Sequence, residues 1–124
     1  MARIFKTIKF EAWAAEVSIS DADLYEAIEE IENGLFEANL GSHLYKKRIS
    51  ISGKGKRGGA RTILAFRKED KAFFIYGYAK SKKSNLSEKE LIAYKEAAKI
   101  FLDLNESELK ELLLTKKIKE IKKS

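Results

Sequence analysis

The stretch from Leu44 to Lys80 restricts the fold most, because its residues alternate in the way that β-strands require. In Leu44–Ser52, the first of three segments, apolar and basic side chains fall on opposite faces. The second segment is Ala60–Phe66, and the third, Lys71–Lys80, is rich in aromatic and β-branched residues. Only four charged residues separate the last two segments. So short a connection predicts an antiparallel hairpin.

The residues on either side of this region have helical periodicity. Apolar side chains recur at spacings of three and four over residues 10–17, and again after Ser20 or Asp21, either of which can cap a second helix. That helix is expected to end at Asn33-Gly34, with one apolar face made of Leu24, Ile28, Ile31 and Leu35. Downstream, capping-box spacings predict a helix after Ser87 and a final helix over about residues 105–121.

These patterns predict a single α+β domain over residues 1–124. We expect a small antiparallel sheet of three to four strands, with the N-terminal helices packed on one face, and C-terminal helices. Residues 2–6 are expected to add a short edge strand. A chain of 124 residues without prolines, repeats or low-complexity linkers suits one domain.

Basic residues are concentrated in the middle of the chain. Residues 46–83 contain 13 Lys/Arg and 2 Asp/Glu, a net charge of +11, whereas residues 1–45 contain 3 Lys/Arg and 9 Asp/Glu, a net charge of −6. Such segregation favours a face that binds a polyanion, and it predicts that the central cations share one patch.

Composition excludes several classes of site. Without cysteine the chain cannot form disulfides, use a thiolate nucleophile or hold zinc through sulfur. No cluster of His, Asp and Glu has metal-ligand spacing, and we expect neither a metal nor a cofactor. The only histidine, His43, is most simply a surface or capping residue. No apolar run is long enough to span a bilayer, so a cytoplasmic protein without membrane contact is expected.

The segment from Ser52 to Arg61 is the most distinctive candidate site, because it combines glycines with cations between two predicted strands. Glycines let a backbone approach a ligand closely, and the cations there are Lys54, Lys56, Arg57 and Arg61. The spacing is not that of a P-loop, and no helix follows. A flexible hairpin connection with solvated lysines is the alternative interpretation.

Other candidates project from the predicted strands toward the same surface. Lys46 and Arg48 share a face of the first strand, and Tyr76, Tyr78 and Lys80 share a face of the third, followed by Lys82 and Lys83. Cations hold phosphates and aromatic rings stack on unpaired bases, so this surface predicts RNA binding. For Tyr76 a place in the core is an equally good interpretation.

Three motifs resemble the RelE/ParE toxin superfamily, and the HigB-like branch of RelE toxins most of all. They are the run GKGKRGGAR (residues 53–61), the strand end IYGYAKS (75–81) and the helix start NLS (85–87). The resemblance implies a toxin of a type II toxin–antitoxin system that a cognate antitoxin silences. It also implies ribosome-dependent cleavage of messenger RNA through the nucleotide's own 2′-hydroxyl, without metal or cofactor. Family roles fall on Lys54, Lys56 and Arg61, and on Tyr78 and Lys80 at the strand end.

The residues suit this chemistry. A fixed guanidinium stabilises the charge that develops on the phosphoryl oxygens, which is the role expected of Arg61, with Arg48 assisting. Lys56 is the first candidate for general base, since neighbouring cations disfavour its protonated form, and Lys54 is the second. Tyr78 is the alternative proton carrier. Two other functions fit the sequence: a ParE-like inhibitor of DNA gyrase and an RNA-binding module without turnover.

Overall fold

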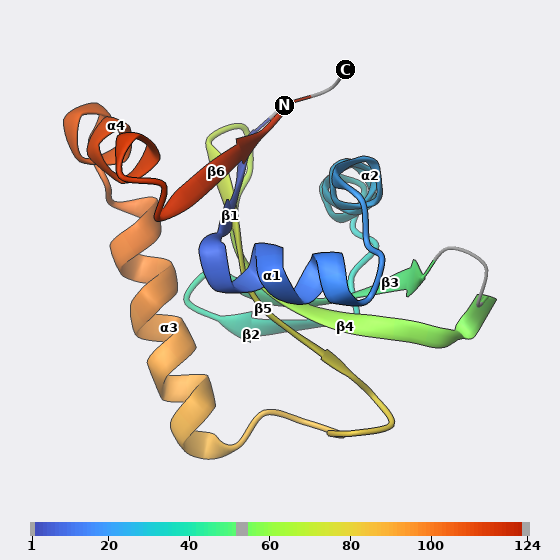
Figure 1. Ribbon diagram of the computed structural model, residues 1–124. Helices are drawn as coiled ribbons and strands as arrows, with labels where there is room; N and C mark the ends of the chain where they lie inside the picture. Colours follow the sequence, from blue (N-terminus) through green and yellow to red (C-terminus); the bar gives the residue numbers. More distant parts are fainter. Residues whose placement is uncertain (1, 52–54, 123–124) are drawn as a thin grey trace.

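The computed structural model describes residues 2–51 and 55–122, and for residues 55–58 it describes the backbone alone. Within these residues there are four helices and six strands, with a run of four strands between two pairs of helices (Figure 1). In order they are β1 (Arg3–Thr7), α1 (Ile8–Glu16), α2 (Asp21–Glu32), β2 (Ala38–Gly41), β3 (Leu44–Ile51), β4 (Gly55–Arg67), β5 (Lys71–Ala79), α3 (Glu88–Leu102), α4 (Glu106–Leu114) and β6 (Ile118–Ile121). The predicted α+β class is confirmed.

The strands form one mixed sheet in the order β2-β3-β4-β5-β1-β6. Its centre is the antiparallel set β3, β4 and β5 that the alternation predicts. The expectation of a three- to four-stranded antiparallel sheet is wrong in two respects. The sheet has six strands among the described residues, and β1 runs parallel to β5 while pairing with β6 on its other side. The N-terminal strand is therefore internal and not at an edge.

The C-terminal helix predicted over residues 105–121 begins where expected, but its predicted end is wrong. Helix α4 ends at Leu114, and Lys116 adopts a left-handed backbone (φ 59°) that turns the chain back toward the sheet. Residues Ile118–Ile121 then pair with β1, and both terminal isoleucines of that strand are buried. The four residues of β6 are too few to show an alternation clearly. The lysines around them are typical of a helix C-terminus, and they therefore favour a longer helix.

The helix starts agree with the capping patterns. Ser20, Ser87 and Asn105 each accept a hydrogen bond from the backbone of the third helical residue, whose side chain bonds back to the cap. Gly34 follows α2 with a φ of 83°, a conformation that favours glycine over other residues. Leu35 does not continue the buried face of α2, because the chain has already left the helix, and its side chain is 58% exposed.

Two hydrophobic layers sandwich the sheet. One packs α1 and α2 against β-strand residues that include Leu64 and Phe74. The other packs α3 and α4 against the opposite face, where Ile63 and Phe73 lie. Helix α1 fits closely because Gly77 of β5 has no side chain, and a Cβ there would overlap the ring of Trp13. The far ends of β3 and β4 extend past α1 as a two-stranded ribbon (Figure 1).

The glycine- and lysine-containing segment differs from the predicted loop. Strand β4 already begins at Gly55, so Lys56 and Arg57 belong to a strand and not to the connection. The register between β3 and β4 shifts beyond Ile49, where Ile51 pairs with Gly55. Among the described residues, no helix has the length and apolar character needed to cross a membrane.

Candidate nucleic-acid interface

The register of the central strands brings several predicted site residues onto one face of the sheet. Arg61 of β4 pairs with Arg48 of β3 on one side and with Tyr78 of β5 on the other. In the next row on the same face, Ile63 pairs with Lys46 and Tyr76. Directly paired residues in a sheet point to the same side, so these cations and phenols form two adjacent rows.

Arg61 is the best-held cation of this surface. Its residue is only 5% exposed, and its Nε lies 2.7 Å from Oε1 of Glu37, which precedes β2. The other carboxylate oxygen of Glu37 lies 3.2 Å from Nζ of Lys46. Lys46 also donates a hydrogen bond of 3.1 Å to the Asn85 side chain. One carboxylate therefore fixes two cations from neighbouring strands.

Tyr78 lies beside this cluster and is 4% exposed. Its hydroxyl has no hydrogen-bond partner among the described residues. Burial raises the pKa of the phenol, although the nearby Lys46 and Arg61 act in the opposite direction. At neutral pH the hydroxyl keeps its proton and can donate it. A buried, unpartnered hydroxyl is costly, and such groups are frequent where a ligand or substrate completes the bonding.

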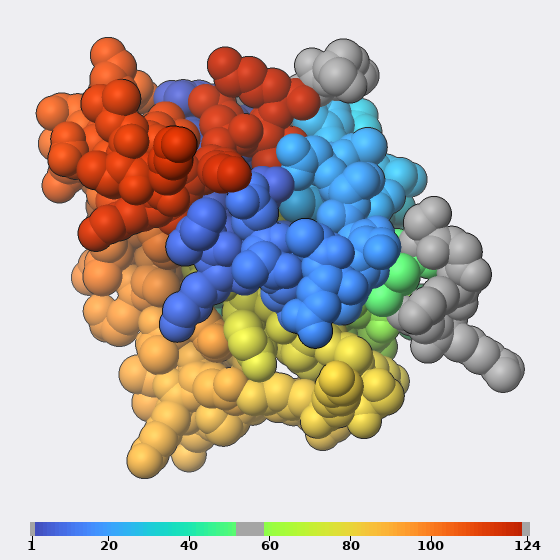
Figure 2. Space-filling view, viewed as in Figure 1, coloured from blue at the N-terminus to red at the C-terminus, as the bar shows by residue number. Residues whose placement is uncertain are grey.

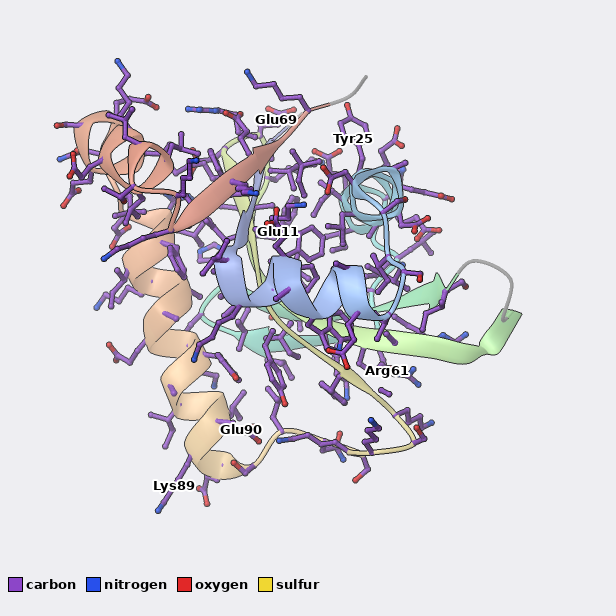
Figure 3. All side chains as sticks on the ribbon, viewed as in Figure 1. Glu11, Tyr25, Arg61, Glu69, Lys89 and Glu90 are labelled. Atoms are coloured by element: carbon purple, nitrogen blue, oxygen red, sulfur yellow. The ribbon has the colours of Figure 1, made fainter. Side chains whose placement is uncertain are left out.

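Tyr76 belongs to an aromatic row that continues onto α3. Its ring stacks on Tyr94 at a centroid distance of 5.2 Å and contacts Tyr78 at 5.8 Å. Nζ of Lys83 lies 5.7 Å from the centre of the Tyr76 ring and is paired with Glu90. The hydrogen bond between them raises the pKa of Lys83 and lowers that of Glu90. Figure 3 shows Arg61 on β4 and Glu90 in the first turn of α3.

The remaining predicted residues are less constrained. Arg48 is exposed on β3, and Lys80 and Lys82 are exposed in the turn that follows β5. Lys54 lies outside the described residues, and so do the side chains of Lys56 and Arg57. The structure thus brings together five of the predicted residues: Lys46, Arg61, Tyr76, Tyr78 and Lys83.

The expectation that all central cations share one patch is wrong. Arg67 and Lys71 lie at the other end of the β4–β5 hairpin, where both pair with Asp70. Lys47 points to the opposite face and pairs with Glu30 of α2. Ion pairs with acidic residues from other segments neutralise much of the charge that looked isolated in the sequence.

Two hollows flank the cation and tyrosine rows. One, of about 570 Å³, lies between α2 and β3, and its lining includes Glu37, Phe36 and Arg48. The other, of about 760 Å³, lies between α1, the end of β5 and the C-terminal elements, and its lining includes Tyr76, Tyr94 and Trp13. Figure 2 shows the surface hollowed between α1 (blue) and α3 (gold). The described residues contain no group of three or more His, Asp or Glu placed to hold a metal ion.

Sequence reasoning missed Glu37, Asn85, Glu90 and Tyr94. Glu37 follows a run of acidic residues that reads as a solvated helix face, and only the pairing of β2 with β3 brings it to Lys46. Tyr94 looks like one more core position of α3. Local sequence patterns do not predict contacts between distant segments. Glu37 and Arg61 are 24 residues apart in the sequence, and so their contact is not predicted.

Two comparisons with known proteins bear on the family to which the chain belongs. A search of curated proteins gave no match. The sequence profile described as "RelE toxin of RelE / RelB toxin-antitoxin system" matches residues 2–121, nearly the whole chain. The protein is therefore a member of the RelE toxin family of toxin–antitoxin systems.

Proposed function

We propose that this RelE-family toxin is a metal-independent endoribonuclease that cleaves messenger RNA on the ribosome and so inhibits translation. The observation that carries the proposal is the joint placement of Arg61, Lys46 and the unpartnered Tyr78 hydroxyl on one sheet surface. Family membership implies a cognate antitoxin. We further propose that the toxin acts in the cytoplasm as a single domain and belongs to the HigB-like branch.

The proposed reaction needs no group beyond the protein and the RNA. The 2′-oxygen loses its proton and attacks the adjacent phosphorus in line with the leaving 5′-oxygen. A new P–O2′ bond forms, the P–O5′ bond breaks, and the 5′-oxygen takes up a proton. The products are a 2′,3′-cyclic phosphate and a free 5′-hydroxyl.

Arg61 is assigned the stabilisation of charge on the phosphoryl oxygens, with Arg48 assisting. A guanidinium offers a rigid fork of donors that matches two phosphate oxygens. The residue is only 5% exposed, so packing already restricts its orientation and little reorganisation is needed as the reaction proceeds.

The Tyr78 phenol suits proton donation to the leaving 5′-oxygen better than proton abstraction. Burial raises its pKa, which keeps the proton on the hydroxyl at neutral pH. Lys56, or Lys54 in its place, is then assigned the role of general base, and Lys80 the role of an accessory cation. This division supplies one group for each of the two proton transfers.

RNA binding is assigned to the residues around the reacting phosphate. Tyr76 presents the start of an aromatic row for base stacking, and Lys46, Arg57, Lys82 and Lys83 supply cations for backbone phosphates.

Replacement of Arg61 tests the proposal in cells. Arg61→Ala is expected to abolish the growth arrest that the wild-type chain causes on expression, because the phosphoryl charge loses its main partner. Lys68→Ala is the matched control: it also removes one cation, from the exposed turn at the far end of the hairpin, and should remain fully toxic.

Arg61→Ala leaves Glu37 paired with Lys46 alone, and we expect a loss of stability on the order of 1–3 kcal/mol. Arg61→Met, which retains the apolar stem, controls for this effect, and thermal unfolding of both purified variants confirms that they are folded. Undiminished toxicity of a folded Arg61 variant rejects the assignment. Stalled gyrase–DNA complexes would instead favour a ParE-like inhibitor, and RNA binding without cleavage a non-catalytic module.

A further inference from the structure

The carboxylate of Glu37 makes the contacts that an RNA phosphate is expected to make. Its two oxygens lie 2.7 Å from Nε of Arg61 and 3.2 Å from Nζ of Lys46. A phosphodiester also presents two charged oxygens that can be shared between a guanidinium and an ammonium. The two anions cannot use this pair of cations together, since like charges at such short range repel strongly.

The residues around the contacts of Glu37 with Arg61 and Lys46 resemble an anion-binding site. Arg61 is buried, Asn85 holds Lys46 in place, and the buried Tyr78 hydroxyl lies in the next strand position without a partner among the described residues. A carboxylate with two oxygens engages both cations and leaves that hydroxyl unpaired. A phosphate has further oxygens that can accept a bond from it.

The Glu37 side chain lies beside a hollow into which it can rotate. Its side chain is 32% exposed and lines the hollow between α2 and β3. Arg48 lines the same hollow and forms no ion pair with any other described side chain. The hollow is also lined by Asp23, Glu26 and Glu30 of α2, so Arg48 is the cation toward which the displaced carboxylate can rotate.

We propose that Glu37 is a displaceable stand-in for the substrate phosphate: it orients Arg61 and Lys46 in the free toxin and leaves them when RNA binds. This inference rests on the proposed function, because it presumes that the ligand of these cations is a phosphodiester. Glu37 is thus a positioning residue, and its departure opposes RNA binding.

Binding of a non-cleavable RNA tests the inference. The probe is a fluorescent, fully 2′-O-methylated single-stranded oligonucleotide, and its affinity for the purified full chain is measured by anisotropy at fixed salt. Glu37→Gln keeps the size of the side chain but removes its charge. We expect this variant to bind the probe about tenfold more tightly, because RNA no longer competes with an anion held by two cations.

Glu30→Gln is the matched control. Glu30 lines the same hollow and forms a comparable ion pair (2.9 Å), but with Lys47, which points to the opposite face of the sheet. Both variants raise the net charge by one, so a general electrostatic gain would appear equally in both. We expect the affinity of Glu30→Gln to stay within about twofold of wild type. Glu37→Ala should reproduce the gain of Glu37→Gln if the charge alone matters.

The outcomes separate the two proposals. Equal or weaker binding by Glu37→Gln and Glu37→Ala, with a wild-type chain that binds the probe, overturns the inference and leaves the proposed function intact. An equal gain in probe affinity in Glu30→Gln also overturns the inference and leaves the proposed function intact. A wild-type chain that binds no probe, or whose binding is unaffected by Arg61→Ala, also overturns the inference. The proposed function fails separately, if folded Arg61 variants remain fully toxic.

Discussion

At the scale of single residues, Tyr78 shows how function and stability can oppose each other. Its ring belongs to the core that α3 covers, yet its hydroxyl is buried without a partner among the described residues. A buried hydroxyl that lacks a hydrogen bond destabilises the folded state by about 1–3 kcal/mol. A chain under selection for stability alone is better served by phenylalanine at this position.

Tyr78→Phe is therefore expected to stabilise the protein by about 1 kcal/mol while lowering RNA cleavage by at least tenfold. The stability gain comes from removing an unpaired polar group, and the loss of activity from removing the proton donor. Chemical denaturation and single-turnover cleavage on programmed ribosomes measure the two effects. A variant that is less stable and cleaves at the wild-type rate would contradict the role given to this hydroxyl.

Strand alternation was enough to predict from the sequence that Lys46, Arg61, Tyr76 and Tyr78 share a surface. It could not predict Glu37, because that contact depends on the turn after α2 and on the pairing of β2 with β3. The alternation of side chains also does not predict that Arg61 is buried. Burial depends on what packs over a strand, which the strand's own sequence does not contain.

At the scale of elements, length decides what the sequence can predict. The helices with capping boxes and the three long central strands have enough residues for a period to be visible. β6 has four residues and is defined by its partner β1, which it joins across more than a hundred positions of the chain. The order β5-β1-β6 therefore could not be read from local patterns.

An ion pair across β1 and β6 gives this contact a measurable pH dependence. Arg3 donates from Nε and Nη2 to the two carboxylate oxygens of Glu120, at 3.0 Å each. This hydrogen bonding lowers the pKa of Glu120 below the ordinary 4.5. A carboxyl with a lowered pKa stabilises the folded state above its ordinary pKa, and that contribution disappears as the pH falls through the lowered value.

Glu120→Gln should thus cost about 0.5–1 kcal/mol near neutral pH, a modest value because Arg3 is partly exposed. Below about pH 4 the difference from wild type should shrink toward zero. Urea unfolding from neutral pH to below pH 4 measures this difference in unfolding free energy. The control is Glu96→Gln, which replaces an exposed glutamate of α3. A difference that stays constant with pH would show that the ion pair is not its source.

At the scale of the whole molecule, charge is arranged differently from its order along the chain. The acidic N-terminal region supplies Glu30 and Glu37, which neutralise cations on both faces of the β3–β4 ribbon. Among the described side chains, the predicted site cations that remain exposed are Arg48, Lys80 and Lys82. The net charge of the central segment favours a polyanionic partner, and long-range ion pairs determine which of its cations remain available to bind one.

The central claim is that the surface around Arg61 cleaves messenger RNA on the ribosome, and mapping of RNA 5′ ends in a purified translation system tests it most directly. The account predicts new 5′-hydroxyl ends with the wild-type chain only when ribosomes are present, and none with folded Arg61→Ala. It would be contradicted by the absence of new ends with wild type on ribosomes, or by equal cleavage with the Arg61 variant.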